Sequence, residues 1–288
     1  PQRTSSYEPM TRALCDRLID GFVERGQADV AADYAQQIPV RVIAHILGVP
    51  PELSDTFTGW VRDVLEFAFD PERRRRGMVG VIEFFQKALA DRREHPGDDL
   101  ISELLHTKVE GESIEDSVIL GMSSLLLIAG VDTTWSAIGS SLWHLATHPD
   151  DRRRLAAEPE LIDTAVEEFL RAYSPVTMAR RLLSDVEYDG CPMKAGERVL
   201  MNFPGANRDP EVFDDPDRVV LDRRVNRHVA FGAGIHRCAG SNLARMELRV
   251  AIQTWMERIP EFEIIDPDSV VWAGGQVRGP REIGRAHV

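Results

Sequence analysis

The sequence predicts a mainly α-helical fold with a small β subdomain confined to the later part of the chain. Apolar residues recur at helical spacing in most segments before Pro175. After Pro175 the pattern changes to short strand-like runs separated by Gly and Pro. A chain of 288 residues can bury a large core, and no linker or internal repeat divides it. We therefore expect a single domain over residues 1–282.

The first half of the chain is expected to be helical. Its segments with helical spacing are Met10–Val23, Val40–Leu47, Leu53–Phe69, Met78–Arg93 and Asp98–His106. A much longer helix is expected to open at Ser113, because Asp116 at the third following position gives an acidic variant of a capping box. It ends before Pro149. Apolar residues on nearly all of its sides predict that this helix is buried in the middle of the domain.

The second half mixes helices and strands. Helices are expected at Asp150–Ala157, Leu161–Tyr173 and Ala239–Arg258, and strands at Val176–Leu183, Val186–Tyr188 and Arg198–Met201. Residues 204–227 are rich in Pro, Asp and Arg and show no clear period, so we expect irregular structure there.

Composition narrows the class of protein. The 34 basic and 47 acidic side chains give a net charge of −13, which argues against nucleic acid or an anionic membrane surface as the main partner. The basic run Arg73–Arg76 is interpreted as a solvated helix start. The three cysteines are too few and uneven for a disulfide framework, which favours the reducing cytoplasm. The longest apolar stretch, Ser123–Ala129, is too short to span a bilayer, and no signal peptide opens the chain.

A Gly-rich loop, Phe231 to Gly240, precedes the last long helix and carries Cys238. Its glycines allow tight turns and close approach to a flat partner. Cys238 stands at the start of a helix, whose positive end favours the thiolate, a good ligand for a soft metal centre. Two other interpretations stay open from the residues alone: a buried structural cysteine, or a nucleophile paired with His236.

The pattern Phe-x-x-Gly-x-His-x-Cys-x-Gly resembles the haem-binding loop of the cytochrome P-450 family, bacterial type. The resemblance implies that Cys238 is the axial ligand of the iron in haem b (iron protoporphyrin IX), where a thiolate favours O–O cleavage. It implies that Phe231 packs beside the sulfur and that His236 hydrogen-bonds a haem propionate. Gly232 and Gly240 are the loop glycines expected to approach the haem.

A second motif, Ala129-Gly130-Val131-Asp132-Thr133-Thr134, lies in the middle of the long helix. Gly, Asp and Thr are unfavourable there, and a buried carboxylate needs a partner. From the residues alone, a bent helix whose Thr hydroxyls bond back to earlier carbonyls is an equal alternative. The resemblance implies that Ala129 and Gly130 leave room for O₂ at the haem and that Asp132 and Thr133 relay protons for its activation.

A third motif is Glu168-Phe169-Leu170-Arg171. Glu and Arg three residues apart form surface ion pairs in many helices, so alone it signals little. The resemblance implies that Glu168 and Arg171 form a buried ion pair joined by an arginine from the irregular segment. Arg218 is the expected third member, with Arg223 and Arg224 as less favoured rivals.

Further positions follow from the same resemblance. Arg180 is expected to reach the second propionate, although without the other motifs it would be interpreted as a surface strand arginine. The residues expected to line a substrate pocket are Val176, Thr177, Met178, Gln276 and Val277.

The two ends of the chain depart from the family pattern. Family members begin with further helices and strands before the point where this chain starts, which predicts a P-450 fold incomplete at its amino end. Residues 283–288, Ile283 to Val288, do not continue the family's last strand. The DNA string ATCGGAAGAGCACACGTC, a common sequencing-library adapter, encodes this hexapeptide. We expect a non-native tail and assign no function to His287.

The resemblance implies a haem-thiolate monooxygenase that inserts one atom of O₂ into a small apolar substrate. Electrons would come from NAD(P)H through a ferredoxin and its reductase, and the enzyme would be a cytoplasmic monomer without a membrane anchor. Two alternatives are a peroxide-driven or isomerising haem-thiolate protein and a haem-based sensor or binding module. Turnover with NADPH and a donor system, compared with turnover on peroxide, would discriminate the first. A ligand-gated change in partner binding without turnover would indicate the second.

Overall fold

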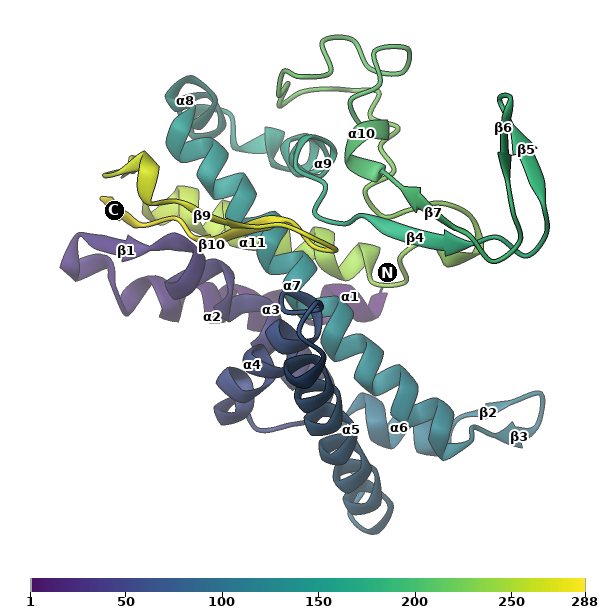
Figure 1. Cartoon of the computed structure of the whole chain (residues 1–288). Coiled ribbons are helices and arrows are strands. Elements are labelled where there is room, and N and C mark those ends of the chain that lie inside the picture. Colours follow the sequence, from purple (N-terminus) through teal and green to yellow (C-terminus); the bar gives the residue numbers. More distant parts are fainter. Residues whose placement is uncertain (1, 288) are drawn as a thin grey trace.

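The computed structural model describes residues 2–287 and is mainly helical, as the sequence predicts (Figure 1). The helices are α1 (Gln2–Ser6), α2 (Glu8–Asp20), α3 (Gln37–Ile46), α4 (Ser54–Leu65), α5 (Pro71–Glu94), α6 (Leu100–His106), α7 (Asp116–Thr147), α8 (Pro149–Ala157), α9 (Ile162–Ala172), α10 (Phe203–Ala206) and α11 (Ser241–Arg258). A π-helical turn, η2 (Val30–Ala35), precedes α3. Short 3₁₀ turns are η1 (Val23–Arg25), η3 (Pro51–Leu53), η4 (Pro159–Leu161), η5 (Gly234–His236) and η6 (Pro267–Ser269).

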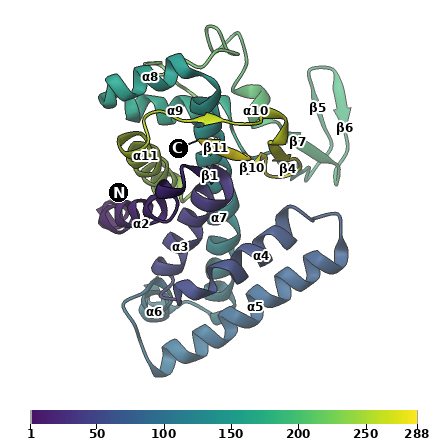
Figure 2. The ribbon, with the colours of Figure 1, turned by 90° about the vertical axis from the view of Figure 1, so that its left-hand side faces the viewer.

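Helix α7 runs through the middle of the molecule in both views (Figures 1 and 2) and packs against α3, α4, α5 and α11. Two expectations about it are wrong. Ser113 lies in strand β3 (Glu112–Ser113), and α7 begins at Asp116 after Glu115, whose side chain makes no capping hydrogen bond. Only the carboxyl-terminal half is buried nearly all round, because Val118 and Leu125 in the first half are exposed.

Helix α7 also meets the length and composition of a membrane span, with a mean hydropathy of 1.6. Its packing explains the apolar composition. Trp135, Ile138 and Leu142 lie in the hydrophobic core together with residues of α3 and α11. The central core helix of a globular domain can be as long and as apolar as a membrane span. The composition of α7 alone therefore does not distinguish these two kinds of helix.

Helices α4 and α5 form an antiparallel hairpin that extends away from the body alongside the first half of α7 (Figure 1). Helix α5 begins at Pro71, earlier than expected, because the Asp70 carboxylate caps the main-chain N–H groups of residues 72 and 73. Two arginines of the basic run are not simply solvated. Arg73 and Arg76 donate to the buried Asp63 of α4 at 2.9 and 2.8 Å. The basic run therefore stabilises the contact between α4 and α5.

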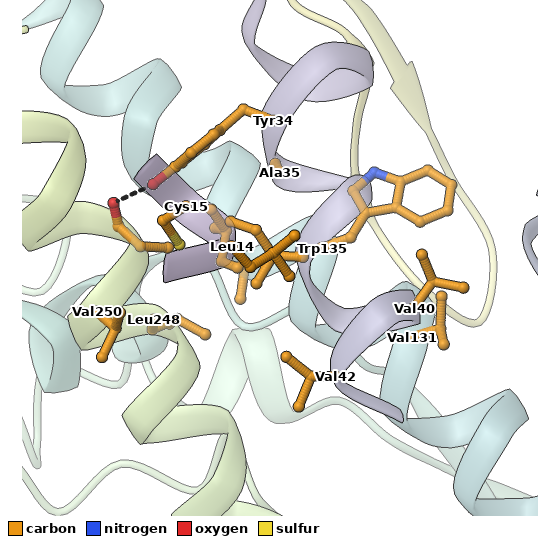
Figure 3. Close-up of a cluster of buried hydrophobic side chains, with 14 of the residues drawn as sticks. Leu14, Cys15, Tyr34, Ala35, Val40, Val42, Val131, Trp135, Leu248 and Val250 are labelled. Carbon is orange, nitrogen blue, oxygen red and sulfur yellow. Dashed lines mark hydrogen bonds between the residues drawn. The ribbon is translucent and has the colours of Figure 1, made fainter. Parts of the chain in front are cut away.

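The hydrophobic core joins residues of α2, η2, α3, α7 and α11 (Figure 3). The Tyr34 hydroxyl donates to the Ala251 carbonyl at 2.8 Å, which ties η2 to α11. The Trp255 ring packs against Tyr34 at an interplanar angle of 59°, with ring centroids 5.0 Å apart. This cluster fixes α11, and hence the loop before it, relative to α7.

The strands are short and form several small sheets. They are β1 (Gln27–Asp29), β2 (Lys108–Val109), β3 (Glu112–Ser113), β4 (Met178–Arg181), β5 (Val186–Tyr188), β6 (Cys191–Met193), β7 (Arg198–Met201), β8 (Glu263–Ile264), β9 (Val271–Ala273), β10 (Gly279–Glu282) and β11 (Arg285–His287). All pairings are antiparallel: β1 with β11, β11 with β8, β2 with β3, β4 with β7, β5 with β6, and β9 with β10. The expectation that strands occur only in the later part is wrong, because β1, β2 and β3 precede α7.

Two sheets contrast in burial. Residues 279–281 of β10 are buried against α7, whereas β4 and β5 are exposed along their whole length. The β5–β6 hairpin stands away from the body in both views (Figures 1 and 2). Residues 285–287 of the segment expected to be non-native pair with β1 and β8, and Val288 lies outside the described residues.

Candidate functional site

The loop before α11 presents Cys238 to the outside of the chain. Its thiol is free and exposed, two residues before Gly240, the N-cap of α11. The Cys238 N–H donates to the Phe231 carbonyl at 2.9 Å, which closes the loop into a compact turn. Gly232 and Gly234 adopt φ values of 69° and 72°, a left-handed conformation that favours glycine. The loop backbone thus holds an exposed thiol just before the start of α11.

A buried ion network joins α9 to the irregular segment that precedes the loop. Glu168 and Arg171 of α9 are fully buried and bonded to each other by two hydrogen bonds of 2.8 Å. The predicted burial of the pair is therefore confirmed. The third member is Arg223, whose Nε donates to Glu168 at 3.0 Å. Arg218 contributes only its main-chain carbonyl, which accepts from Arg171 at 2.8 Å, so the assignment to its side chain is wrong.

A face of α7 is open along an apolar row. Val118, Met122 and Leu125 are exposed, and the row continues through Ala129 to the partly exposed Thr133. The Thr133 hydroxyl donates to the Ala129 carbonyl at 2.7 Å, one helical turn earlier. The alternative of back-bonding hydroxyls is therefore confirmed for Thr133.

Asp132 points the other way, into the protein. Arg281 of β10 donates to its carboxylate at 2.9 Å, and the Ser136 hydroxyl donates at 3.3 Å. Arg281 also lies 3.3 Å from the carboxylate of Glu66, just after α4. Among the described residues no hydrogen bond joins Asp132 to Thr133. Sequence reasoning missed Arg281, since nothing in the local pattern links the chain end to α7.

Burial dominates the electrostatics of Asp132. Its side chain is 1% exposed, and burial raises the pKa of the carboxyl, while Arg281 and Ser136 act in the opposite direction. The balance leaves the pKa above its usual value. Asp132 is therefore a buried acid whose proton is held more tightly than in water.

The contact between α7 and β10 depends on Gly279. A β-carbon at this position would lie 2.3 Å from the Ser136 β-carbon, a separation that real atoms do not adopt. The absence of a side chain lets β10 approach the helix closely. Beside this contact, the Trp135 indole donates to the Pro280 carbonyl at 3.2 Å. The close approach places Arg281 within reach of Asp132.

The structure brings together the two segments expected to line a pocket. Val176 and Val277 form an isolated antiparallel bridge, and the Thr177 N–H donates to the Gln276 carbonyl at 3.1 Å. Met178 and Gln276 are exposed, whereas Val277 is buried. Separately, Arg180 on β4 is exposed with a guanidinium bonded only to the Ala179 carbonyl among the described residues, and His236 is exposed on the Cys238 loop.

Comparison with known proteins decides the family. A family profile described as Cytochrome P450 matches residues 72–268. The chain is 36% identical over 290 residues to mycinamicin IV hydroxylase/epoxidase of Micromonospora griseorubida, covering 98% of this chain and 73% of the relative. It is 39% identical over 267 residues to vitamin D(3) 25-hydroxylase of Pseudonocardia autotrophica, covering 91% of this chain and 66% of the relative. The solved structure of cytochrome P450 PksS from Bacillus subtilis superposes with a TM-score of 0.94 at 32% identity, covering 100% of this chain and 75% of that chain.

The chain belongs to the cytochrome P450 family. It is a haem-thiolate monooxygenase of the soluble bacterial type, its cofactor is haem b, and its electrons come from a redox partner. The chain spans roughly two thirds to three quarters of the length of these relatives.

The P450 residues present here fit a haem. The cofactor needs one thiolate ligand and apolar surfaces beside its flat ring. Cys238 supplies an exposed thiol, and no cluster of three or more His, Cys, Asp or Glu side chains suited to a metal competes with it within the part of the chain that the structure describes. Ile235 on the loop is 97% exposed and Leu125 on α7 is 64% exposed, unusual for such side chains in water.

Proposed function

We propose that Cys238 is the thiolate that binds the iron in this monooxygenase. The observation that carries the proposal is the exposed, unpaired Cys238 thiol on a glycine-shaped loop at the start of α11. The other two cysteines are poorer candidates. Burial raises the pKa of Cys15 to about 12, so it stays a thiol, and Cys191 lies on the β5–β6 hairpin away from the helix starts. Phe231, Gly232 and Gly240 shape the loop around the sulfur.

When bound, the haem supplies the chemistry of O₂ activation. We propose that Asp132 holds a proton and that Thr133 positions it on the open face of α7. Burial raises the pKa of Asp132, which favours the protonated form that a proton donor requires. Thr133 is partly exposed on the face that carries Ala129, so its hydroxyl can turn from the Ala129 carbonyl toward a bound molecule. Gly130 packs against Ile43 of α3, where a β-carbon would lie 2.9 Å from the Ile43 side chain. A water molecule or a rotation of Thr133 has to link the two groups.

The remaining assignments are proposals of the same kind. Arg180 and His236 are exposed donors that would bind the haem propionates. Val176, Thr177, Met178, Gln276 and Val277, joined by the bridge between their segments, would line the pocket for a small apolar organic substrate. We further propose that the redox partner is a ferredoxin served by a reductase and that the enzyme works as a cytoplasmic monomer.

The test is the carbon-monoxide difference spectrum of the reduced protein for Cys238→Ser, with Cys191→Ser as an exposed control and Cys15→Ser as a buried one. We expect a thiolate-type red-shifted Soret band in the parent and both controls and its loss in Cys238→Ser, together with all monooxygenation. A thiolate-type band that persists in Cys238→Ser would overturn the assignment.

A further inference from the structure

Two adjacent glutamates on α9 hold different segments of the chain. Glu168 binds the irregular segment through Arg223 and the N–H of Val220. Glu167 faces the other way and binds the two sides of the Cys238 loop. It accepts from His228, three residues before Phe231, at 2.9 Å and from Arg245 of α11 at 2.5 Å.

His228 is oriented by the backbone of the loop. Its Nδ1 accepts the main-chain N–H of Ala230 at 3.2 Å, so Nε2 carries the proton that is donated to Glu167. The imidazole is buried, with a side chain that is 3% exposed. Its orientation is therefore fixed from both ring nitrogens.

Arg245 is oriented in turn by Glu167. A second hydrogen bond from Nη2, at 2.9 Å, makes the ion pair bidentate. The guanidinium carbon then lies 4.5 Å from the centroid of the Phe231 ring, within the range of a cation–π contact. The His228 ring lies 6.1 Å from the same centroid. Phe231 is thus held by both partners of Glu167.

Phe231 transmits this restraint to the cysteine. Its carbonyl accepts the Cys238 N–H, so a shift of Phe231 moves the residue that carries the thiol. We propose that Glu167, His228 and Arg245 form a clamp that positions Phe231 and Cys238 and whose balanced charges set how strongly the sulfur donates electrons to the iron. The electronic part of this proposal rests on the proposed role of Cys238; the geometric part does not. Glu167, His228 and Arg245 are positioning residues.

The charge state of Glu167 supports a permanently balanced pair. Burial raises the pKa of this carboxyl, but the hydrogen bonds from His228 and Arg245 outweigh burial and lower the pKa to about 2. At neutral pH the carboxylate compensates the guanidinium. Removing either charge alone leaves its partner uncompensated beside the loop.

This makes a prediction about sign. In Glu167→Gln an uncompensated cation remains, which favours the less positive, reduced iron, so the reduction potential of the haem-loaded protein should rise. In Arg245→Met the carboxylate remains, so the potential should fall. The double variant should return toward the parent value. A purely structural role would move all three in the same direction.

Helix α11 offers a matched control one turn further on. Arg249 forms a bidentate pair with Glu8, and the two side chains are 28% and 32% exposed, against 29% and 30% for Arg245 and Glu167. Glu8→Gln and Arg249→Met should leave the potential and the Soret position unchanged. Equal shifts in the control pair, or the same sign in Glu167→Gln and Arg245→Met, would overturn the electronic part.

A second measurement needs no haem. Hydrogen exchange of the peptide covering residues 231–240 should become faster in Glu167→Gln, because the restraint on the Cys238 N–H is lost, and not in Glu8→Gln. Unchanged exchange in both would overturn the clamp itself. If Cys238 is not the ligand, the thiolate-type band persists in Cys238→Ser while the exchange result is unaffected. The failure of the ligand assignment and the failure of the clamp are therefore distinguishable.

Discussion

Helices α9 and α7 each bury a carboxylate, and the two sites differ in how many donors surround it. Glu168 is 0% exposed and accepts from Arg171, Arg223, Asn226 and the N–H of Val220. Asp132 is 1% exposed but accepts only from Arg281 and Ser136 among the described residues. The Glu168 carboxylate is surrounded by donors from two parts of the chain and joins α9 to the irregular segment. The Asp132 carboxylate has fewer donors, and burial raises its pKa above the usual value. Two equally buried carboxylates therefore differ in role: Glu168 joins two segments of the chain, whereas Asp132 is a group whose pKa lies above its usual value.

The largest expected effect is on the free energy of unfolding and concerns Glu168. Glu168→Ala should lower the free energy of unfolding by roughly 3–5 kcal/mol, because Arg171 and Arg223 stay buried without their partner. Urea unfolding at pH 7 measures it, with the exposed Glu160→Ala as control. Equal midpoints for the two variants would mean that the network adds nothing to stability.

Glu247 on α11 extends the comparison to a carboxyl with an unpartnered oxygen. It is fully buried, and burial raises its pKa from 4.5 to about 8. The folded state then keeps a proton that the unfolded chain has lost. Stability from this group is complete below pH 4.5 and is lost as the pH rises toward 8, by about 1.4 kcal/mol per pH unit.

The comparison variant for this prediction is Glu247→Gln. Burial lowers the pKa of His144 to about 4, and that group acts in the opposite direction below pH 6.5. The informative quantity is therefore the difference between parent and Glu247→Gln in urea unfolding from pH 5 to 8. A difference that does not change with pH would show that Glu247 titrates normally.

Arg281→Met tests the site of Asp132. It should lower the free energy of unfolding by less, about 1–3 kcal/mol, because Asp132 can take up a proton when its cation is removed. The variant raises the pKa of Asp132 further, so the loss of stability should be greater at pH 8 than at pH 5. Arg278→Met, exposed on the same segment, is the control. A cost that is the same at both pH values would show that Arg281 does not influence the ionisation of Asp132.

Thr133→Ala should have the smallest effect on stability, under about 0.5 kcal/mol, because its hydroxyl bonds only to a carbonyl of its own helix among the described residues. Product formed per NADPH should nevertheless fall, with hydrogen peroxide rising to match. Thr147→Ala also removes a hydroxyl that bonds back to its own helix, at 2.9 Å from the Trp143 carbonyl and 3.2 Å from the His144 carbonyl, and should leave coupling unchanged. Equal coupling in both variants would remove Thr133 from the proposed proton path.

The sequence predicted what short-range patterns encode. The helices and the strands Val186–Tyr188 and Arg198–Met201 follow from apolar spacing and from Gly and Pro positions, and the loop geometry of Cys238 from its glycines. Boundaries set by side-chain caps were less accurate. Ser113 matches a capping pattern, yet the turn at Gly111, with φ of 91°, draws it into a hairpin.

Contacts between segments far apart in the chain could not be predicted from sequence patterns. Arg218 and Arg223 lie on the same irregular segment, and only the path of the backbone decides which guanidinium reaches Glu168. Arg281 lies 149 positions from Asp132, so no local period relates them. The pairing of β1 with β11 is equally remote along the chain.

The close contact at Gly279 has a consequence for which sequences this fold can accept. Any side chain at 279 must push β10 away from Ser136, and Arg281, two residues later on the same strand, would move with it. In a library with all residues at position 279, we therefore expect almost only glycine to be selected. This should hold even when the selection is for the pKa of Asp132 and not for folding. Gly279 on β10 would then influence the protonation of Asp132 on α7 although it has no side chain. The range of residues tolerated at position 279 would reveal this influence better than any contact distance.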